Sequence, residues 1–266
     1  MEETAFAKVN LALHIRAREP DGYHRIETLF AFCEHGDRLR VEEGEGLSLA
    51  VTGPFADALA GEEDNLVLRA ARALGGGRGA ALTLEKNLPV ASGIGGGSAD
   101  AAAALRLLNR WWGIGAPEAE LVGIAASLGA DVPACVLSRT ARGEGKGDRL
   151  SEAALDVAGM PILLVNPGVP VSTAAVFRTW DGVDRGPLLT LADSRNDLEP
   201  PALTLAPAID AVLARLTGAE GASLVRMSGS GATCFALFAD EAARDAAAAA
   251  IAAEHPDWWR LASRLR

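Results

Sequence analysis

Leu88-Pro89-Val90-Ala91-Ser92-Gly93-Ile94-Gly95-Gly96-Gly97-Ser98-Ala99-Asp100 is the stretch that decides the fold of this chain. An expected strand over 81–86 leads into it, and an expected helix over 98–112 leads out. Glycine has no Cβ, so the backbone can approach an anion closely and turn its amides toward it. The helix start adds amides and the positive end of the helix dipole. The pattern predicts a phosphate cradle, with a flexible glycine connector as the alternative.

Two common phosphate-binding motifs do not fit this loop. A Walker loop needs Gly-Lys-Ser or Gly-Lys-Thr, whereas Gly145-Lys146 is followed by Gly147. A dinucleotide loop needs a third glycine where Ser98 stands. The His-Arg-Asp and Asp-Phe-Gly signatures of protein kinases are missing from the sequence. The loop is therefore expected to be a cradle of another kind, in which Ser98 caps the helix, binds phosphate or contacts magnesium.

Upstream of the loop, residues 4–15 alternate between apolar and partly polar positions. This alternation predicts a strand on which Lys8 and Asn10 share one face. A turn is expected at Pro20-Asp21-Gly22. Two ring side chains follow it directly, Tyr23 and His24.

Other elements follow from periodicity and turn residues. We expect strands near 28–33, 37–42, 47–52, 162–166, 222–227, 232–239 and 258–262, and helices near 65–74, 117–129, 173–180, 207–217 and 240–253. Asp64 is the expected cap of the helix over 65–74. The stretch 181–200 is polar and rich in turn residues, and a domain boundary is expected near 150–160.

Two further segments combine polar groups with turn residues. Gly129-Ala130-Asp131-Val132-Pro133 places a carboxylate between a helix stop and a proline. On its own, Asp131 fits a cap or turn residue better than a catalytic group. Met227-Ser228-Gly229-Ser230-Gly231-Ala232-Thr233 lies between two expected strands and fits an ordinary glycine hairpin.

Composition limits the classes of partner. The 266 residues carry 25 basic and 35 acidic side chains, a net charge of −10, which disfavours nucleic acid but leaves a small phosphorylated ligand open. The three cysteines form no Cys-x-x-Cys pair and suggest neither disulfides nor zinc. The N-terminus does not read as a signal peptide, and no apolar run approaches the ~20 residues of a membrane span. We expect a cytoplasmic protein with no membrane partner.

Taken together and in order, the first-strand lysine, the Pro-x-x-x-Gly-x-Gly-Gly-Gly-Ser loop and the late Gly-Ser-Gly-Ala segment resemble the GHMP kinase superfamily. The resemblance spans nearly the whole chain. It implies an α+β fold of two domains, a ribosomal S5-like N-terminal domain over 1–155 and a ferredoxin-like C-terminal domain over 156–266. Further motifs resemble the branch of that superfamily whose substrate carries a cytidine diphosphate group: Ala7-Lys8-Val9-Asn10-Leu11, Asp21-Gly22-Tyr23-His24, Glu63-Asp64-Asn65-Leu66 and Leu128-Gly129-Ala130-Asp131-Val132-Pro133.

The resemblance implies an ATP- and Mg²⁺-dependent kinase of the non-mevalonate route to isoprenoid precursors. Its small-molecule substrate would join cytidine diphosphate to methylerythritol and be phosphorylated on the 2-hydroxyl. By position, the catalytic pair is Lys8 and Asp131. The ATP-binding residues are Asn65, Lys86, Pro89, Val90, Ala91, Ser92, Gly93, Ile94, Gly95, Gly96, Gly97, Ser98 and Ala99, with Ser98 also a magnesium contact. The substrate-binding residues are Asn10, Tyr23, His24, Thr173 and Phe177.

The resemblance has two departures, both in the glycine-rich loop. Many relatives have Ser-Ser-Asn where this chain has Ser98-Ala99-Asp100, and Gly-Gly where it has Ala91-Ser92. Both lie at the rim of the loop, so nucleotide binding is still expected while the magnesium contacts stay open.

The expected roles leave alternatives at single residues. Tyr23 can stack on a flat pyrimidine with Phe177 on the other side, although Phe177 can equally be core. His24 can bond along the pyrimidine edge or be an exposed turn residue. Lys8 is expected to orient Asp131 and offset charge. Asp131 either accepts the hydroxyl proton or mainly orients the hydroxyl.

Two rival functions remain at this stage. One is another alcohol kinase of the superfamily, against which Tyr23 and His24 argue. The other is a non-catalytic binding module on the same fold, against which the net charge and the presence of both Lys8 and Asp131 argue. The sequence is compatible with a monomer or a homodimer.

Overall fold

The computed structural model describes residues 1–62 and 64–266 and divides them into two compact units. Unit 1 comprises Met1–Lys8, His35–Val90 and Gly95–Arg139. Unit 2 comprises Val9–Glu34, Ala91–Ile94 and Thr140–Arg266. Each unit thus gathers segments from distant parts of the sequence, and the contiguous division at 155/156 stays a prediction.

Two long strands, β1 (Glu2–Arg18) and β2 (His24–Glu42), contribute one end to each unit. In unit 1, the end of β2 pairs antiparallel with β4 (Ala80–Glu85), which pairs parallel with β3 (Leu47–Thr52). The expectation of separate strands near 28–33 and 37–42 is wrong, because β2 runs through both. Gly36 lies inside this strand, where a Cβ would stand 1.9 Å from the backbone oxygen of Ala5. The glycine therefore allows close backbone approach.

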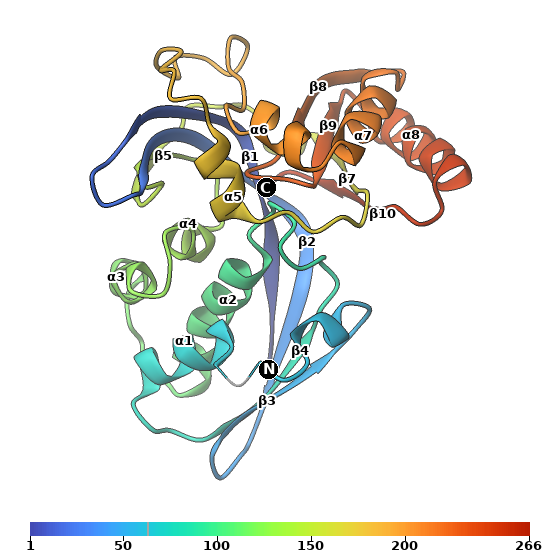
Figure 1. The fold of residues 1–266 in the computed structure, drawn as a ribbon. Helices are drawn as coiled ribbons and strands as arrows, with labels where there is room; N and C mark the ends of the chain where they lie inside the picture. The colour runs from blue at the N-terminus through green and yellow to red at the C-terminus, as the bar shows by residue number, and fades with distance from the viewer. Residues whose placement is uncertain (63) are drawn as a thin grey trace. The chain divides into compact units, whose positions relative to one another are not determined.

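The helices of unit 1 are the 3-10 turn η1 (Ala56–Leu59), α1 (Leu66–Gly75), α2 (Gly96–Trp111), α3 (Glu118–Ala126) and α4 (Val132–Leu137). Figure 1 shows α1 and α2 side by side, and their residues are in contact. Asn65, not Asp64, caps α1, since its Oδ1 accepts from the Val67 amide at 2.9 Å. The helix α2 begins at Gly96 rather than 98, because Gly95 adopts a φ of 63° at the N-cap.

In unit 2 the main sheet has the strand order β10-β7-β9-β8, all antiparallel. The strands are β7 (Pro161–Asn166), β8 (Ala222–Met227), β9 (Cys234–Phe238) and β10 (Trp259–Arg264). The helices are α5 (Thr173–Thr179), α6 (Glu199–Leu205), α7 (Ala208–Thr217) and α8 (Glu241–Glu254). Every residue of β7 and β9 is buried, as expected of strands at the centre of a core. Asp240 caps α8 by accepting from the Ala243 amide.

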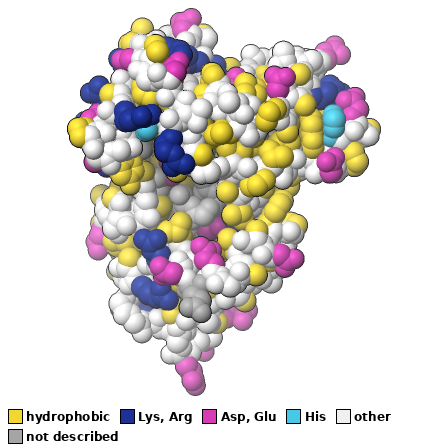
Figure 2. Space-filling view, in the orientation of Figure 1, with side chains coloured by type: hydrophobic (Ala, Val, Ile, Leu, Met, Phe, Trp, Pro, Cys, Tyr) yellow, Lys and Arg dark blue, Asp and Glu magenta, His cyan; other side chains and the backbone are white. Residues whose placement is uncertain are grey.

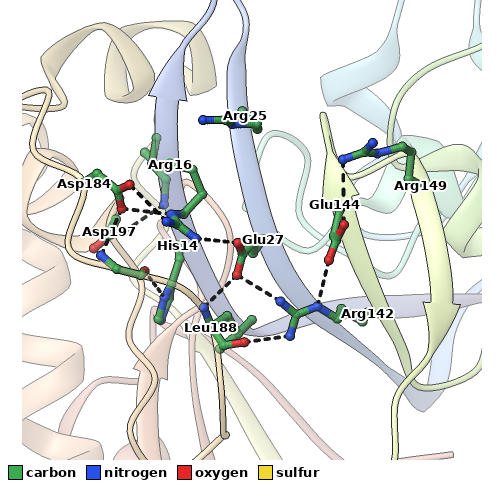
Figure 3. Close-up of polar contacts among 12 residues, drawn as sticks. His14, Arg16, Arg25, Glu27, Arg142, Glu144, Arg149, Asp184, Leu188 and Asp197 are labelled. Carbon is green, nitrogen blue, oxygen red and sulfur yellow. Dashed lines mark hydrogen bonds and ion pairs between the residues drawn. The ribbon is translucent and has the colours of Figure 1, made fainter.

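The start of β2 pairs in unit 2 with β5 (Ala141–Gly145), which pairs with β6 (Arg149–Glu152). Figure 3 shows the polar network that attaches the stretch 181–197 to these strands. Glu27 accepts from Arg16, Arg142 and the Leu188 amide, at 2.6, 2.9 and 2.7 Å. Burial opposes the charge of Glu27, but these donors outweigh it and lower its pKa. The polar stretch is therefore held by specific bonds. None of the helices in the described part of the chain is long and apolar enough to cross a membrane.

Candidate active site

Lys8 and Asp131 form an ion pair in unit 1, with Nζ and Oδ2 3.1 Å apart. The Lys8 side chain on β1 is 4% exposed, whereas that of Asp131 is 38% exposed. Asp131 occupies the N-cap position of α4, but its side chain makes no capping hydrogen bond. Asp131 thus lies in a turn at a cap position, as expected, but its side chain does not act as a cap. The carboxylate is held by a buried ammonium and stays accessible, which is the arrangement a group needs to meet a substrate hydroxyl.

The start of α2 lies against the side chain of Lys8. A Cβ on Gly95, at its φ of 63°, would stand 2.8 Å from Lys8 Cε, so only glycine fits there. The first-turn amides of a helix lack intrahelical acceptors and carry partial positive charge. The segment from Gly95 to Ala99 thus presents amides and a dipole next to an ammonium, a combination suited to anionic phosphate oxygens.

Lys86 lies in a buried ion cluster. Its Nζ donates to Asp37 Oδ2 at 2.5 Å and to Asp100 Oδ2 at 2.7 Å. A Cβ placed on Gly96 would stand 3.0 Å from this Nζ. Burial opposes the charge of Lys86, but the two carboxylates outweigh it and raise its pKa. Burial raises the pKa of Asp100 well above its usual range, against the effect of Lys86. The ammonium is thus fully engaged inside unit 1, so a direct contact of Lys86 with adenosine stays a prediction.

Asp37 connects this cluster to the residues before the glycine-rich loop. Its Oδ1 accepts from the backbone amides of Asn87 and Leu88, at 2.5 and 2.8 Å. A single carboxylate therefore fixes both the lysine and the chain that leads to Pro89 and Val90. Sequence reasoning missed Asp37, because an acidic residue in an ordinary strand carries no local signal.

A pocket of about 470 Å³ opens beside Asn65 in unit 1. Its surface is almost evenly divided between polar and apolar atoms and comes from Leu49, Val51, Ala56, Asp57, Leu59, Ala60, Gly61, Glu62 and Leu68 in addition to Asn65. Asn65 is 7% exposed, and its amide donates to Glu62 while its oxygen caps α1. A concave space with both apolar and polar walls is suited to the flat, polar-edged ring of a nucleotide base. Glu63 of the Glu63–Leu66 motif lies outside the described residues.

In unit 2, residues 91–94 of the loop rest on the turn between β8 and β9. Ser228 Oγ donates to the Gly93 carbonyl at 2.9 Å, and the Thr233 amide donates to the Ser92 carbonyl at 3.1 Å. A Cβ on Gly93, whose φ is 78°, would stand 2.4 Å from the Ser228 oxygen. The segment 227–233, interpreted as an ordinary hairpin, therefore supports the glycine-rich loop.

The same turn contacts two predicted substrate residues. The Asn10 amide donates to Ser228 Oγ at 3.1 Å, while the Asn10 side chain donates to Thr28 at 2.8 Å. The hydroxyls of Thr173 and Ser230 lie 2.8 Å apart. Unit 2 thus brings Asn10, Thr173 and residues 91–94 together around one turn.

His24 and Phe177 also come together in unit 2. Their ring centroids are 5.0 Å apart, and Trp180 meets His24 edge-on at 5.6 Å. His24 is only 7% exposed, so its interpretation as an exposed turn residue is wrong. Burial first and the charge of Arg18 second lower the pKa of His24. Phe177 is half-buried and packs both on the core of the unit and on His24.

Tyr23 is 56% exposed beside this ring cluster. Lys146 lies over the Tyr23 ring at 3.6 Å from its centroid and pairs with Asp21 at 3.0 Å. Figure 2 shows Lys and Arg side chains beside a histidine over α5. Sequence reasoning missed Lys146 and Arg18 at this site, since both reach it by tertiary contact. The paired stacking of Tyr23 and Phe177 around a pyrimidine stays a prediction.

Comparison with protein-family models agrees with the motif order. Residues 65–139 match the model of the GHMP kinases N terminal domain, and residues 181–257 match that of the GHMP kinases C terminal domain. The two matches cover the start of α2 and the turn between β8 and β9. They show a two-domain α+β GHMP kinase fold.

Full-length relatives are more specific. A 4-diphosphocytidyl-2-C-methyl-D-erythritol kinase of Rhizorhabdus wittichii is 57% identical, covering 99% of this chain and 94% of the relative. One of the same name from Sphingopyxis alaskensis is 51% identical, covering 100% and 99%. A crystal structure of a 4-(cytidine 5'-diphospho)-2C-methyl-D-erythritol kinase matches with a TM-score of 0.84 and 36% identity, covering 100% of this chain and 99% of that chain.

Proposed function

The chain belongs to the 4-diphosphocytidyl-2-C-methyl-D-erythritol kinase family of the GHMP kinases, and on this premise we propose how its own residues carry out the reaction. It is an ATP-dependent kinase that acts in the non-mevalonate route to isoprenoid precursors. It transfers the γ-phosphoryl of ATP to the 2-hydroxyl of 4-diphosphocytidyl-2-C-methyl-D-erythritol and leaves ADP. The main observation behind the proposed catalytic site is the ion pair of Lys8 and Asp131 next to the start of α2.

Phosphoryl transfer depends mainly on positioning and on charge neutralisation. The amides of the segment from Gly95 to Ala99 and the dipole of α2 bind the phosphates in our proposal. Residues 89–94 are also proposed to bind ATP, as the resemblance implies. The pocket beside Asn65 takes the adenine ring, because it is concave and offers both apolar and polar walls. Lys86 supports the cradle through its buried cluster.

Asp131 faces the acceptor hydroxyl, since its carboxylate is exposed while Lys8 is not. The carboxylate orients the hydroxyl and accepts its proton as the oxygen attacks phosphorus. Lys8 orients the carboxylate through their ion pair. The same ammonium offsets negative charge that develops on the transferred group.

The substrate is held by the predicted set of residues in unit 2, Asn10, Tyr23, His24, Thr173 and Phe177. Tyr23 offers one face of its ring to the cytosine, because Lys146 covers the other. His24 and Phe177 form a packed ring pair beside it. Asn10 and Thr173 place polar groups at the turn that supports residues 91–94.

Magnesium is expected to bind together with ATP. Within the described ranges, His, Cys, Asp and Glu side chains do not gather in threes that could hold a metal. In kinase sites Mg²⁺ is usually carried by substrate phosphates together with one or two protein ligands. Ser98, half-buried in the first turn of α2, is the side chain proposed to contact it. Bound in this way, the ion would neutralise phosphate charge.

We also propose a cytoplasmic protein.

Release of ADP tests this function. Purified protein is mixed with Mg²⁺, ATP and the cytidylyl substrate, or with methylerythritol phosphate that lacks the cytidylyl group. We expect turnover with the cytidylyl compound only. Equal turnover of both compounds would contradict the cytidine pocket. Turnover of another alcohol instead would favour the rival kinase, and nucleotide binding without turnover of any alcohol would favour the binding module.

A further inference from the structure

Arg18, at the end of β1, forms a hydrogen bond with the ring of His24, one of the residues proposed to bind the substrate. Its Nε donates to His24 Nε2 at 3.3 Å, and its Nη2 donates to the backbone carbonyl of Arg178 at 3.3 Å. The guanidinium thus connects His24 on β2 to the helix α5. No motif or resemblance assigned a role to Arg18.

This contact determines where the imidazole carries its hydrogen. A guanidinium is always charged and has donors only, so His24 Nε2 must accept. An imidazole that accepts at Nε2 is neutral and carries its hydrogen on Nδ1. The lowered pKa of His24 agrees with a neutral ring.

The surroundings of His24 favour the same state. On α5 and just after it, the ring meets the uncharged rings of Phe177 and Trp180. The charged group that acts on the ring is Arg18 of β1, while Arg178 turns its carbonyl toward the guanidinium. A second ring hydrogen, on Nε2, would therefore be buried and would face a guanidinium, which has no acceptor for it. The protonated ring would also lie beside a like charge.

We propose that Arg18 is a positioning residue for pyrimidine recognition, which fixes His24 as the neutral imidazole whose Nδ1–H donates to an acceptor on the base. Cytosine presents such acceptors at N3 and O2. This inference rests on the proposed function, because it names the device by which the same pocket binds its cytidylyl substrate. Arg18 acts through His24 and does not touch the reacting atoms.

The tautomer can be measured without any turnover. Nitrogen-15 NMR of histidine-labelled protein distinguishes a protonated ring nitrogen from a bare one. We expect wild-type His24 to show a protonated Nδ1 and a bare Nε2. Arg18→Met should give a mixture of tautomers and a higher His24 pKa, because one of the two causes that lower it is removed. Arg18→Lys should restore the wild-type state in part, since it retains a charged donor.

Kinetics test the link to the substrate. For Arg18→Met we expect the KM for the cytidylyl substrate to rise about tenfold, the scale of one lost hydrogen bond to a ligand. The KM for ATP and kcat should stay within about twofold, since neither involves the pyrimidine. In the wild type, the substrate KM should also rise as the pH falls through the lowered pKa of His24. Protonation removes the Nε2 acceptor of the Arg18 hydrogen bond, so the ring that presents Nδ1–H is no longer held in place.

Arg25→Met is the matched control. Arg25 follows His24 in the sequence, is exposed and lies 3.7 Å from Glu19, so its loss removes the same charge without touching the ring. A control that reproduced the Arg18→Met effects would overturn the proposal, as would a wild-type ring protonated at Nε2. A changed tautomer with an unchanged substrate KM would overturn the role in recognition. A wild type without any turnover would contradict the proposed function, while the NMR result would still decide the tautomer.

Discussion

Two lysines of unit 1 form ion pairs with aspartates, Lys8 with one and Lys86 with two, and the two sites differ in the exposure of the carboxylates rather than of the lysines. Lys8 and Lys86 are both buried, with side chains 4% and 2% exposed. Asp131, the partner of Lys8, is 38% exposed, whereas Asp37 and Asp100 are 0% and 3% exposed. An accessible carboxylate can meet a substrate, and a closed cluster can only hold its surroundings. We therefore propose that the same residue chemistry serves reaction in one place and support in the other.

The closed cluster explains why three segments keep their places. Lys86 follows β4, Asp37 belongs to β2 and Asp100 to α2, and Asp37 also holds the amides of Asn87 and Leu88. Removal of one member of a buried ion cluster leaves the remaining buried groups without the partner that compensates them. Lys8 pairs instead with the accessible carboxylate of Asp131. Variants of the two lysines should therefore fail in different ways.

The largest expected effect is on turnover, in Lys8→Met. The variant loses the charge that orients Asp131 and offsets the transferred phosphoryl, so kcat should fall by about 10²–10⁴-fold. Steady-state ADP release measures kcat, and circular dichroism measures the fold. A folded variant with near-normal kcat would contradict the role of Lys8 and remove the distinction between the two pairs.

Lys86→Met should instead unfold the protein more readily. Loss of the buried ammonium leaves two carboxylates without their cation, and the free energy of unfolding should fall by about 3–5 kcal/mol. Urea unfolding measures this change. Arg40→Met is the control, because Arg40 pairs with Glu2 on the exposed side of β2 and its loss should change stability little. An unchanged free energy of unfolding in Lys86→Met would contradict the supporting role of the Lys86 cluster.

The sequence predicted the residues of the open pair and missed the partners of the closed one. Lys8 and Asp131 stand in motifs that resemble the GHMP kinases, so their roles followed from position. Asp37 has no such context, and its bonds to Lys86, Asn87 and Leu88 arise from tertiary packing. The helix α4 was not expected, because Pro133 at its start looked like a turn signal, although proline is well tolerated in a first helical turn.

In unit 2, too, motifs identified some residues of the site while residues that reach it by tertiary contact were missed. The rings Tyr23, His24 and Phe177 were expected at the substrate pocket from motif and resemblance. The burial of His24 was not, because the turn at residues 20–22 suggested exposure. Lys146 and Arg18 reach the rings from other strands and segments, and no local pattern reports such contacts.

A substitution away from both lysine sites should change KM without changing kcat or stability. Tyr23→Ala removes an exposed ring that offers one face to the base. We expect the KM for the cytidylyl substrate to rise about two- to tenfold, the scale of one aromatic stacking contact. The KM for ATP should not change. Equal increases in both values would exclude the stacking role.

The smallest expected effect concerns a buried thiol beside the open pair. Burial first and the charge of Asp131 second raise the pKa of Cys135 to about 12, so the thiol should stay unreactive at neutral pH. Labelling with a thiol reagent should be as slow in Lys8→Met as in the wild type. It should be faster in Lys86→Met, which opens unit 1 more often. Rapid labelling of Cys135 in Lys8→Met would show that the open pair also supports the fold.

The most direct test of the central claim is a single-turnover measurement on Asp131→Asn. Excess enzyme is mixed with radiolabelled ATP and the cytidylyl substrate, and the rate of phosphoryl transfer is followed beside the Kd for ATP. The account predicts that transfer slows by at least about 100-fold while the Kd for ATP stays within about twofold. Transfer at the wild-type rate, or a loss of ATP affinity that alone explains the defect, would contradict the assignment of Asp131 to the reaction.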